Sequence, residues 1–208
     1  MNHYFVISAF ILLGYLIGSI PFSYLTGMIF RRVDIRKHGS RNVGATNVLR
    51  VLGWKYGLIA LLLDVGKGIL AIFLLQKSIA NPASLTLILT GLAAILGHMF
   101  PIFLKFKGGK GVATSAGVFF YLVPLTSLAA LIVFICTVII SRYVSLGSLL
   151  AALTLFLIQL HTNIKNGFSE PELFGFVTIT VIFIFIGHRS NIRRLLTGSE
   201  NRIRFHKG

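Results

Sequence analysis

The chain has 208 residues, of which 55% are hydrophobic and 18 are Phe, and its mean hydropathy of +0.86 lies outside the usual range of soluble globular domains. It carries 20 Lys and Arg against 5 Asp and Glu, a formal net charge of +15. These values exclude a soluble globular protein and predict an all-α integral membrane protein with a single domain over residues 1–208. Its cationic polar parts are expected to meet anionic lipid headgroups or anionic substrates, and no nucleic acid.

Long apolar stretches predict the membrane spans, because a helix needs about 20 apolar residues to cross the hydrocarbon core. Four stretches come close to that length, at residues 4–30, 56–75, 83–104 and 171–187. The first is too long for the apolar region of a signal peptide and has no basic residues before it. We expect it to remain as a membrane span.

The stretch 112–141 is too long for one upright helix and is interrupted by Pro124, which cannot continue the backbone hydrogen bonds. It is consistent with one bent span or with two short helices, at 112–123 and 125–140. A further short span follows at 146–160. The single cysteine, Cys136, lies within this apolar sequence and is expected only to pack.

The distribution of basic residues decides between six and seven spans, because Lys and Arg collect on the cytoplasmic side. The segments expected outside carry only Lys77 and Lys165. Seven spans place every basic cluster inside, whereas six would send the basic tail outside. We therefore predict seven transmembrane helices, several of them short or tilted, with the N-terminus out and the C-terminus in. The cytoplasmic (inner) membrane is the expected location.

The first polar patch on the predicted cytoplasmic side is DIRKHGSRNVGATNVLR, residues 34–50. Small hydrogen-bonding residues alternate there with Gly39 and Gly44, which let the backbone turn and approach a ligand. Such a segment can surround an oxyanion. The alternative is an ordinary polar turn followed by a helix whose N-cap is Thr46 or Asn47.

The second patch, FKGGKG, is not a Walker A loop, because Lys110 is followed by Gly111 rather than by Ser or Thr. The backbone N–H groups of Gly108, Gly109 and Gly111 are expected to point at one anion, with a helix starting near Val112 behind them. Lys110 would supply the charge. The alternative is a flexible turn at the membrane surface with a snorkelling lysine.

The third patch combines SRYVSLGS, residues 141–148, with HRSNIRRLLTGSE, residues 188–200. His188 and Asn191 are three residues apart, so they share a face if the last helix continues through them. The alternative is an amphipathic tail that meets anionic lipid. We prefer that alternative for the tail arginines, Arg193, Arg194, Arg202 and Arg204.

Two charged residues fall inside the second predicted span, where unpaired charges are unfavourable. Asp64 and Lys67 are three residues apart and are expected to form a mutually neutralising structural pair. His98, at the inner end of the third span, has no second ligand at metal spacing and is expected to be a hydrogen-bonded packing histidine. We expect neither a metal nor a cofactor.

Several catalytic patterns are missing. The sequence has no H-x-x-x-x-D, and its closest approach to G-x-S-x-G is ATSAG. The only acids on the predicted cytoplasmic side are Asp34 and Glu200, which argues against a two-carboxylate hydrolase or a magnesium-dependent phosphotransferase. Cationic patches on one face suggest two anionic ligands, whose unit charges about 6 Å apart repel by roughly 3 kcal/mol at an effective dielectric near 20. The groups available to offset this repulsion are Arg50, Lys110, Arg142 and protonated His188.

Five segments resemble the successive motifs of the bacterial acyl-phosphate-dependent glycerol-3-phosphate acyltransferases, in the family's order and over most of the chain. They are IGSIPFSYL, DIRKHGSRNVGATNVLR, GHMFPIFLKFKGGKGVAT, SRYVSLGS and HRSNIRRLLTGSE. The resemblance implies transfer of a fatty acyl group from acyl phosphate to the 1-hydroxyl of glycerol 3-phosphate. The products would be lysophosphatidate and phosphate, in the first acylation of phospholipid synthesis.

The resemblance also implies roles for individual residues. It assigns the acyl-phosphate headgroup to Ser40, Asn42, Gly44, Thr46 and Asn47. It assigns glycerol 3-phosphate to Arg50, Gly108, Gly109, Lys110, Gly111, Ser148, His188 and Asn191. Of these, Lys110, His188 and Asn191 would be catalytic, and Glu200 would be structural.

The implied reaction is a direct attack without a covalent intermediate, and its base is either His188 or a substrate phosphate. One departure from the family is Arg41, which stands where the family usually has Gly. If position 41 needs a positive φ, the arginine is strained or the loop differs. The resemblance also implies docking of a soluble enzyme that produces acyl phosphate, for which the tail arginines offer a cationic surface. The remaining alternatives are a transporter of small phosphorylated metabolites and an acyl-CoA-dependent acyltransferase.

Overall fold

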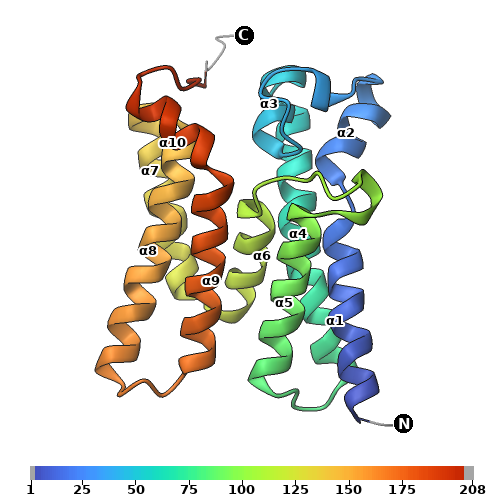
Figure 1. The fold of residues 1–208 in the computed structure, drawn as a ribbon, viewed down its shortest axis with the longest axis vertical. Helices are drawn as coiled ribbons and strands as arrows, with labels where there is room; N and C mark the ends of the chain where they lie inside the picture. Colours follow the sequence, from blue (N-terminus) through green and yellow to red (C-terminus); the bar gives the residue numbers. More distant parts are fainter. Residues whose placement is uncertain (1–2, 204–208) are drawn as a thin grey trace. The chain divides into compact units, whose positions relative to one another are not determined.

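The computed structural model describes residues 3–203, all of whose regular elements are helices (Figure 1). Arg204 lies outside these described residues. The chain divides into two compact units, Met1–Leu122 and Val123–Gly208.

The first unit contains six α-helices and two short 3-10 helices among its described residues. These elements are α1 (His3–Ser19), α2 (Phe22–Arg31), η1 (Ile35–Lys37), α3 (Ala45–Leu52), α4 (Trp54–Ser78), α5 (Ser84–Met99), η2 (Ile102–Leu104) and α6 (Val112–Leu122). The first predicted span is broken between α1 and α2, where Pro21 precedes the second helix. Proline stops the preceding backbone ladder there.

Glycines allow the helices of the first unit to pack closely. A Cβ atom on Gly18 of α1 would lie 2.0 Å from the carbonyl oxygen of Ala94 on α5, and one on Gly117 of α6 would lie 2.0 Å from that of Val65 on α4. Such contacts between backbones are typical of membrane helices. A small apolar core of Ile17, Ala71 and Ala94 joins α1, α4 and α5.

The second unit is built from four helices in its described part. They are α7 (Pro124–Ser141), α8 (Val144–Lys165), α9 (Pro171–Gly187) and α10 (Arg189–Leu196). The chain turns from α7 to α8 at Arg142, whose φ of 63° is left-handed. Cys136 is exposed on α7, so the prediction that it packs is wrong within this unit.

Helix length and composition give five candidate spans in the described residues: Phe5–Arg31, Trp54–Ser78, Ser84–Leu104, Pro124–Ser141 and Val144–Lys165. A sixth is present if α9 and α10, which meet at a bend of 59°, count as one span. The predicted pair of helices on either side of Pro124 is confirmed, and α6 is the shorter, with 11 residues. The count of seven spans and the sides of the termini remain predictions.

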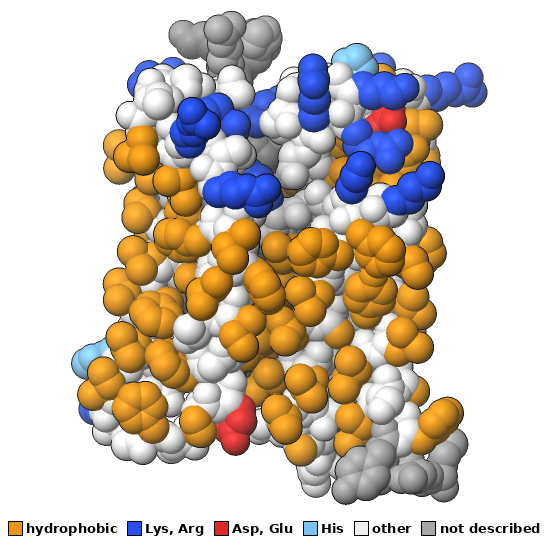
Figure 2. Space-filling view, in the orientation of Figure 1, with side chains coloured by type: hydrophobic (Ala, Val, Ile, Leu, Met, Phe, Trp, Pro, Cys, Tyr) orange, Lys and Arg blue, Asp and Glu red, His pale blue; other side chains and the backbone are white. Residues whose placement is uncertain are grey.

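Each unit, taken by itself, separates apolar from basic side chains. Figure 2 shows hydrophobic side chains along the helices, and most of the visible Lys and Arg near one end of each unit. In the first unit, Lys55 and Lys77 lie near opposite ends of α4. Among the described residues of this unit, Lys77 is the only Lys or Arg near its end, whereas Lys55 shares its end with the basic loop between α2 and α3.

Candidate functional site

The loop between α2 and α3 carries the first predicted patch. Its only acid, Asp34, forms an ion pair of 2.8 Å with Arg36, whose guanidinium also lies over the ring of Tyr24. The hydrogen bond from the Arg36 side chain holds the pKa of Asp34 down at about 2. Its charge is therefore offset locally, and the rest of the loop is cationic.

Asn47 is the residue that holds this loop together. Its Oδ1 accepts from the backbone N–H of Ser40 at 2.8 Å, and its Nδ2 donates to the carbonyl oxygens of Ile35 at 2.8 Å and His38 at 3.1 Å. The side chain is 1% exposed. Asn47 thus uses both amide hydrogens within the protein, and it shapes the loop rather than facing a ligand. The N-cap of α3 is Gly44, so the alternative with Thr46 or Asn47 as the cap is wrong.

The other predicted headgroup residues remain accessible around that loop. Ser40 is exposed, and Asn42, Gly44 and Thr46 are half-buried. Arg41 is exposed and has a φ of 59°, so position 41 does take the left-handed conformation that favours glycine.

The second predicted patch, residues 106–111, is here called the glycine loop, and its backbone is hydrogen-bonded to the end of α5. The N–H of Gly108 donates to the carbonyl oxygen of Met99, and the N–H of Gly109 donates to that of His98, both at 3.1 Å. This contradicts the prediction that these two N–H groups point at an anion. Of the three expected groups, the N–H of Gly111 remains a candidate, followed by the first turn of α6, whose N–H groups have no partners within their own helix.

Glycine is needed at these positions because the backbone passes so close to its neighbours. A Cβ atom on Gly108 would lie 2.1 Å from the carbonyl oxygen of His98, and one on Gly109 would lie 2.5 Å from that of Val43. The second contact joins the glycine loop to the α2–α3 loop. The first and second predicted patches therefore adjoin within the first unit, where Arg50 and Lys110 are both half-buried.

The first unit also contains a buried polar cluster of Asp64, Lys67 and His98. Lys67 Nζ is 2.9 Å from Asp64 Oδ1, and both side chains are 1% exposed, so the predicted ion pair is present. Ser23 donates to Asp64 Oδ2 at 2.7 Å, and Lys67 donates to the carbonyl oxygen of Ile20 at 2.8 Å. His98 Nδ1 lies 3.5 Å from Asp64 Oδ1. His98 therefore does pack in the interior, but next to a carboxylate that sequence reasoning did not connect to it.

In the second unit, His188 stands at the bend between α9 and α10. Its buried ring places Nδ1 2.8 Å from the carbonyl oxygen of Ile184. Because a carbonyl oxygen only accepts, Nδ1 carries the hydrogen, and Nε2 is the basic nitrogen of the neutral ring. The helix does not continue straight through this residue, so the expected single face with Asn191 is replaced by two helices meeting at 59°.

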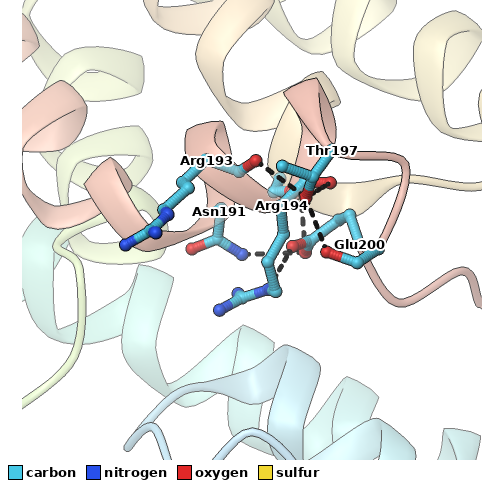
Figure 3. A network of polar contacts seen from close by, with 7 residues as sticks. Asn191, Arg193, Arg194, Thr197 and Glu200 are labelled. Atoms are coloured by element: carbon cyan, nitrogen blue, oxygen red, sulfur yellow. Dashed lines mark hydrogen bonds and ion pairs between the residues drawn. The ribbon is translucent and has the colours of Figure 1, made fainter.

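Glu200 organises the end of the second unit (Figure 3). Its carboxylate accepts from Asn191 at 2.8 Å, from Arg194 at 2.7 Å and from Ser145 at 3.1 Å. Burial alone would raise the pKa of Glu200, but these three hydrogen bonds outweigh it and hold the pKa below its ordinary value. Arg194 therefore binds a carboxylate, which corrects its assignment to a simple lipid-facing tail, and Glu200 fixes the position of the Asn191 amide.

Ser148 lies near the beginning of α8 and is 4% exposed. Its hydroxyl donates to the carbonyl oxygen of Val144 at 2.9 Å, one helical turn earlier. In this rotamer the oxygen can only accept a further hydrogen bond. Over the described residues, no group of three or more His, Cys, Asp or Glu could hold a metal ion.

The family model described as glycerol-3-phosphate acyltransferase matches residues 8–198. The chain belongs to this family. It is 44% identical over 195 residues to glycerol-3-phosphate acyltransferase 2 of Bacillus anthracis, covering 93% of this chain and 97% of that protein. The glycerol-3-phosphate acyltransferase of Fusobacterium nucleatum is 43% identical over 196 residues, covering 94% and 97%.

Two solved structures have the same fold. The crystal structure of the integral membrane glycerol 3-phosphate acyltransferase PlsY in its glycerol 3-phosphate form superposes with a TM-score of 0.85 at 39% identity, covering 95% of this chain and 96% of that one. The lysophosphatidic acid form of PlsY gives a TM-score of 0.83 at the same identity, with 95% of each chain covered. The chain is therefore an integral membrane acyltransferase, and this membership favours the enzyme over the transporter alternative.

Proposed function

We propose that this chain transfers a fatty acyl group from acyl phosphate to the 1-hydroxyl of glycerol 3-phosphate, which yields lysophosphatidate and phosphate. The observation that carries the proposal is the contact between the Gly109 backbone and Val43 in the first unit. It joins a glycine loop carrying Lys110 to a loop of small hydroxyl and amide side chains. Together they form a cationic surface suited to phosphate groups. The forms in which PlsY was solved, with glycerol 3-phosphate and with lysophosphatidic acid, support the same acceptor and product.

The headgroup of acyl phosphate is assigned to the α2–α3 loop. Ser40, Asn42 and Thr46 are accessible enough to donate to phosphate oxygens, and Gly44 lets the backbone approach them. Asn47 acts indirectly, through the shape of the loop.

The family resemblance assigns glycerol 3-phosphate to a set of cationic, hydroxyl, imidazole and amide groups. In the first unit these are Arg50 and Lys110, with Gly111 at the start of α6. In the second unit they are Ser148, His188 and Asn191. Gly108 and Gly109 serve this role by holding Lys110 in place, since their N–H groups bind Met99 and His98.

The reaction requires alignment of the acceptor hydroxyl with the acyl carbonyl more than it requires activation of either substrate. Acyl phosphate is a mixed anhydride with a good leaving group, so the acceptor hydroxyl can attack its carbonyl carbon directly, and the bond to phosphate oxygen then breaks. The developing negative charge on the departing phosphate is stabilised by Lys110 and neighbouring N–H groups. The hydroxyl proton goes either to His188 Nε2 or to a substrate phosphate, whose second pKa lies near 6.

Two variants of His188 separate these bases. Gln places its amide nitrogen near Nε2 and Asn places it near Nδ1, and neither amide can accept a proton. If His188 is the base, both variants lose about 100-fold or more in kcat. If it only binds phosphate through Nε2, His188→Gln keeps most of kcat and His188→Asn raises KM for glycerol 3-phosphate.

The donor is tested with purified protein in detergent. Glycerol 3-phosphate is supplied with either palmitoyl phosphate or palmitoyl-CoA, and lysophosphatidate is measured by mass spectrometry. The proposal expects product from the acyl phosphate alone. Product from palmitoyl-CoA alone would refute the proposed donor, and phosphate release without lysophosphatidate would indicate a hydrolase.

We also propose that the basic ends face the cytoplasm in a seven-span arrangement in the inner membrane. In a Cys136→Ser background, a cysteine at Lys107 should be protected from a membrane-impermeant thiol reagent in intact cells, and one at Lys77 should react. The reverse pattern would refute the orientation. The exposed tail arginines Arg193 and Arg202, of which Arg202 also binds the Tyr143 hydroxyl, would then lie on the side where a soluble acyl-phosphate-producing enzyme docks.

A further inference from the structure

Asp64 touches both flanks of the glycine loop. Before the loop, His98 at the end of α5 has its Nδ1 3.5 Å from the Asp64 carboxylate. After the loop, Thr114 in the first turn of α6 donates its hydroxyl to the backbone carbonyl oxygen of Asp64 at 3.1 Å. A single residue of α4 therefore contacts both α5 and α6, the helices that the loop carrying Lys110 connects.

His98 transmits this contact to the loop itself. Its carbonyl oxygen accepts from the Gly109 N–H at 3.1 Å. A Cβ atom on Gly109 would lie 2.2 Å from His98 Nε2, so the ring is packed directly against the backbone of the loop. The imidazole is thus held between the Asp64 carboxylate and the residue that precedes Lys110.

Asp64 is itself held in place. Its second carboxylate oxygen accepts from Ser23, and Lys67, its ion-pair partner, donates to the carbonyl oxygen of Ile20 at the break between α1 and α2. Asp64, Lys67 and His98 are each 7% exposed or less, and Thr114 is fully buried. A carboxylate in such surroundings has little freedom to move.

We infer that Asp64 acts as a clamp on the glycine loop, which means that it holds the two ends of the loop in place through its contacts with His98 and Thr114. His98 and Thr114 are then positioning residues for the binding of glycerol 3-phosphate by Lys110. The inference rests on the proposed function. An ion pair that served stability alone would need only Asp64 and Lys67. The clamp explains why His98 and Thr114, on opposite sides of the loop, both meet the same residue.

Thr114→Val tests one arm of the clamp, because it removes the hydroxyl and keeps the shape. The Asp64 carbonyl has a second lone pair for its own helix, so folding should be retained. Thr90→Val is the matched control: Thr90 is also fully buried in the first unit, and its hydroxyl has no hydrogen-bond partner among the described residues. Thr114→Ser restores the hydroxyl. His98→Leu and His98→Asn form a second pair, in which Asn can keep a donor toward Asp64.

Binding of glycerol 3-phosphate is measured by calorimetry in detergent without an acyl donor, and hydrogen exchange of the 105–111 amides is measured by mass spectrometry. We expect Thr114→Val and His98→Leu to weaken binding by about three- to tenfold and to speed exchange of the loop. Thr114→Ser, His98→Asn and Thr90→Val should stay within about twofold of the wild type. KM for acyl phosphate should not change.

Unchanged loop exchange in Thr114→Val and His98→Leu would overturn the clamp, as would an equal effect of Thr90→Val or an equal loss for both substrates. The exchange measurement needs no substrate, so it decides the clamp independently of the reaction. A wild-type chain that binds glycerol 3-phosphate but rejects acyl phosphate would instead refute the proposed donor.

Discussion

The backbone N–H of Ser40 donates a hydrogen bond of 2.8 Å to Oδ1 of Asn47, seven residues later in the chain. The Asn47 side chain makes two further bonds to the loop, so Asn47→Ala would leave the Ser40 N–H without this partner and would remove one of two hydrogen bonds from each of the Ile35 and His38 carbonyl oxygens. We expect a loss of stability of about 2–3 kcal/mol and a higher KM for acyl phosphate. Asn47→Asp keeps the acceptor but replaces both donors, and it should be about as harmful.

Asn42→Ala is the control for this prediction. Asn42 is half-buried, and its side chain makes no hydrogen bond among the described residues. If it contacts acyl phosphate, its loss should raise KM without lowering the melting temperature in differential scanning fluorimetry. An Asn47→Ala variant that melts like the wild type would contradict the structural role of Asn47.

The helical architecture could be predicted from the sequence because apolar length and proline position are local signals. Pro124 was expected to divide the 112–141 stretch, and α7 begins at that proline. The sequence did not predict the break at Pro21, because no polar stretch interrupts the apolar sequence there and marks the end of a helix. The predicted span 171–187 ends where α9 ends, at Gly187, and only the bend of 59° into α10 was not predicted.

For the candidate site, the sequence predicted contacts within one helix but not contacts between helices. The sequence indicated Asp64 and Lys67 as a pair because their spacing is helical, and the pair is present. The contact of Asp64 with His98 joins residues on different helices, and no local spacing reports it. The glycines of GGKG suggested an anion nest, but the same residue type serves close backbone packing, and only tertiary structure distinguishes the two for Gly108 and Gly109.

Arg41 offers a direct test of backbone strain. Its φ of 59° places a side chain in a conformation that costs about 1 kcal/mol or more for residues other than glycine. Arg41→Gly should raise the melting temperature slightly, because the relief of strain exceeds the added freedom of the unfolded chain. Arg41→Ala removes the same charge and keeps the strain, so it should give no gain. Equal melting temperatures for the two variants would argue against strain at this position.

Gly109→Ala should damage the glycine loop. The added methyl group would lie 2.5 Å from the Val43 carbonyl oxygen and 2.2 Å from His98 Nε2, so the backbone must shift. We expect KM for glycerol 3-phosphate to rise by about tenfold or more, with a smaller effect on KM for acyl phosphate. Gly66→Ala in α4 is the control, since nothing lies within 4 Å of its added Cβ atom and alanine favours a helix. A normal KM in Gly109→Ala would show that the loop tolerates displacement.

The Asp64–Lys67 pair should be sensitive to removal of either partner. Asp64→Asn or Lys67→Met leaves one buried charge without its counterion, which costs about 3–5 kcal/mol in comparable sites. The double variant removes both charges, so its melting temperature should lie above that of at least one single variant. Additive losses in a double-mutant cycle would instead mean that the two charges do not depend on each other.

Glu200 predicts a specific dependence of stability on acid. Three hydrogen bonds keep the pKa of its carboxyl below the ordinary value of 4.5, so the folded state favours the ionised form more than the unfolded state does. The resulting stabilisation is complete above about pH 4.5 and is lost as the pH falls through the lower pKa of the folded state.

Glu200→Gln cannot titrate and lacks this contribution at every pH. The difference in melting temperature between the wild type and Glu200→Gln should therefore be constant around neutral pH and shrink below about pH 4.5. Asp34, whose pKa is about 2, titrates alike in both proteins and cancels from the difference. A difference that grows on acidification would mean that Glu200 is held in its protonated form, which would contradict its bond with Arg194.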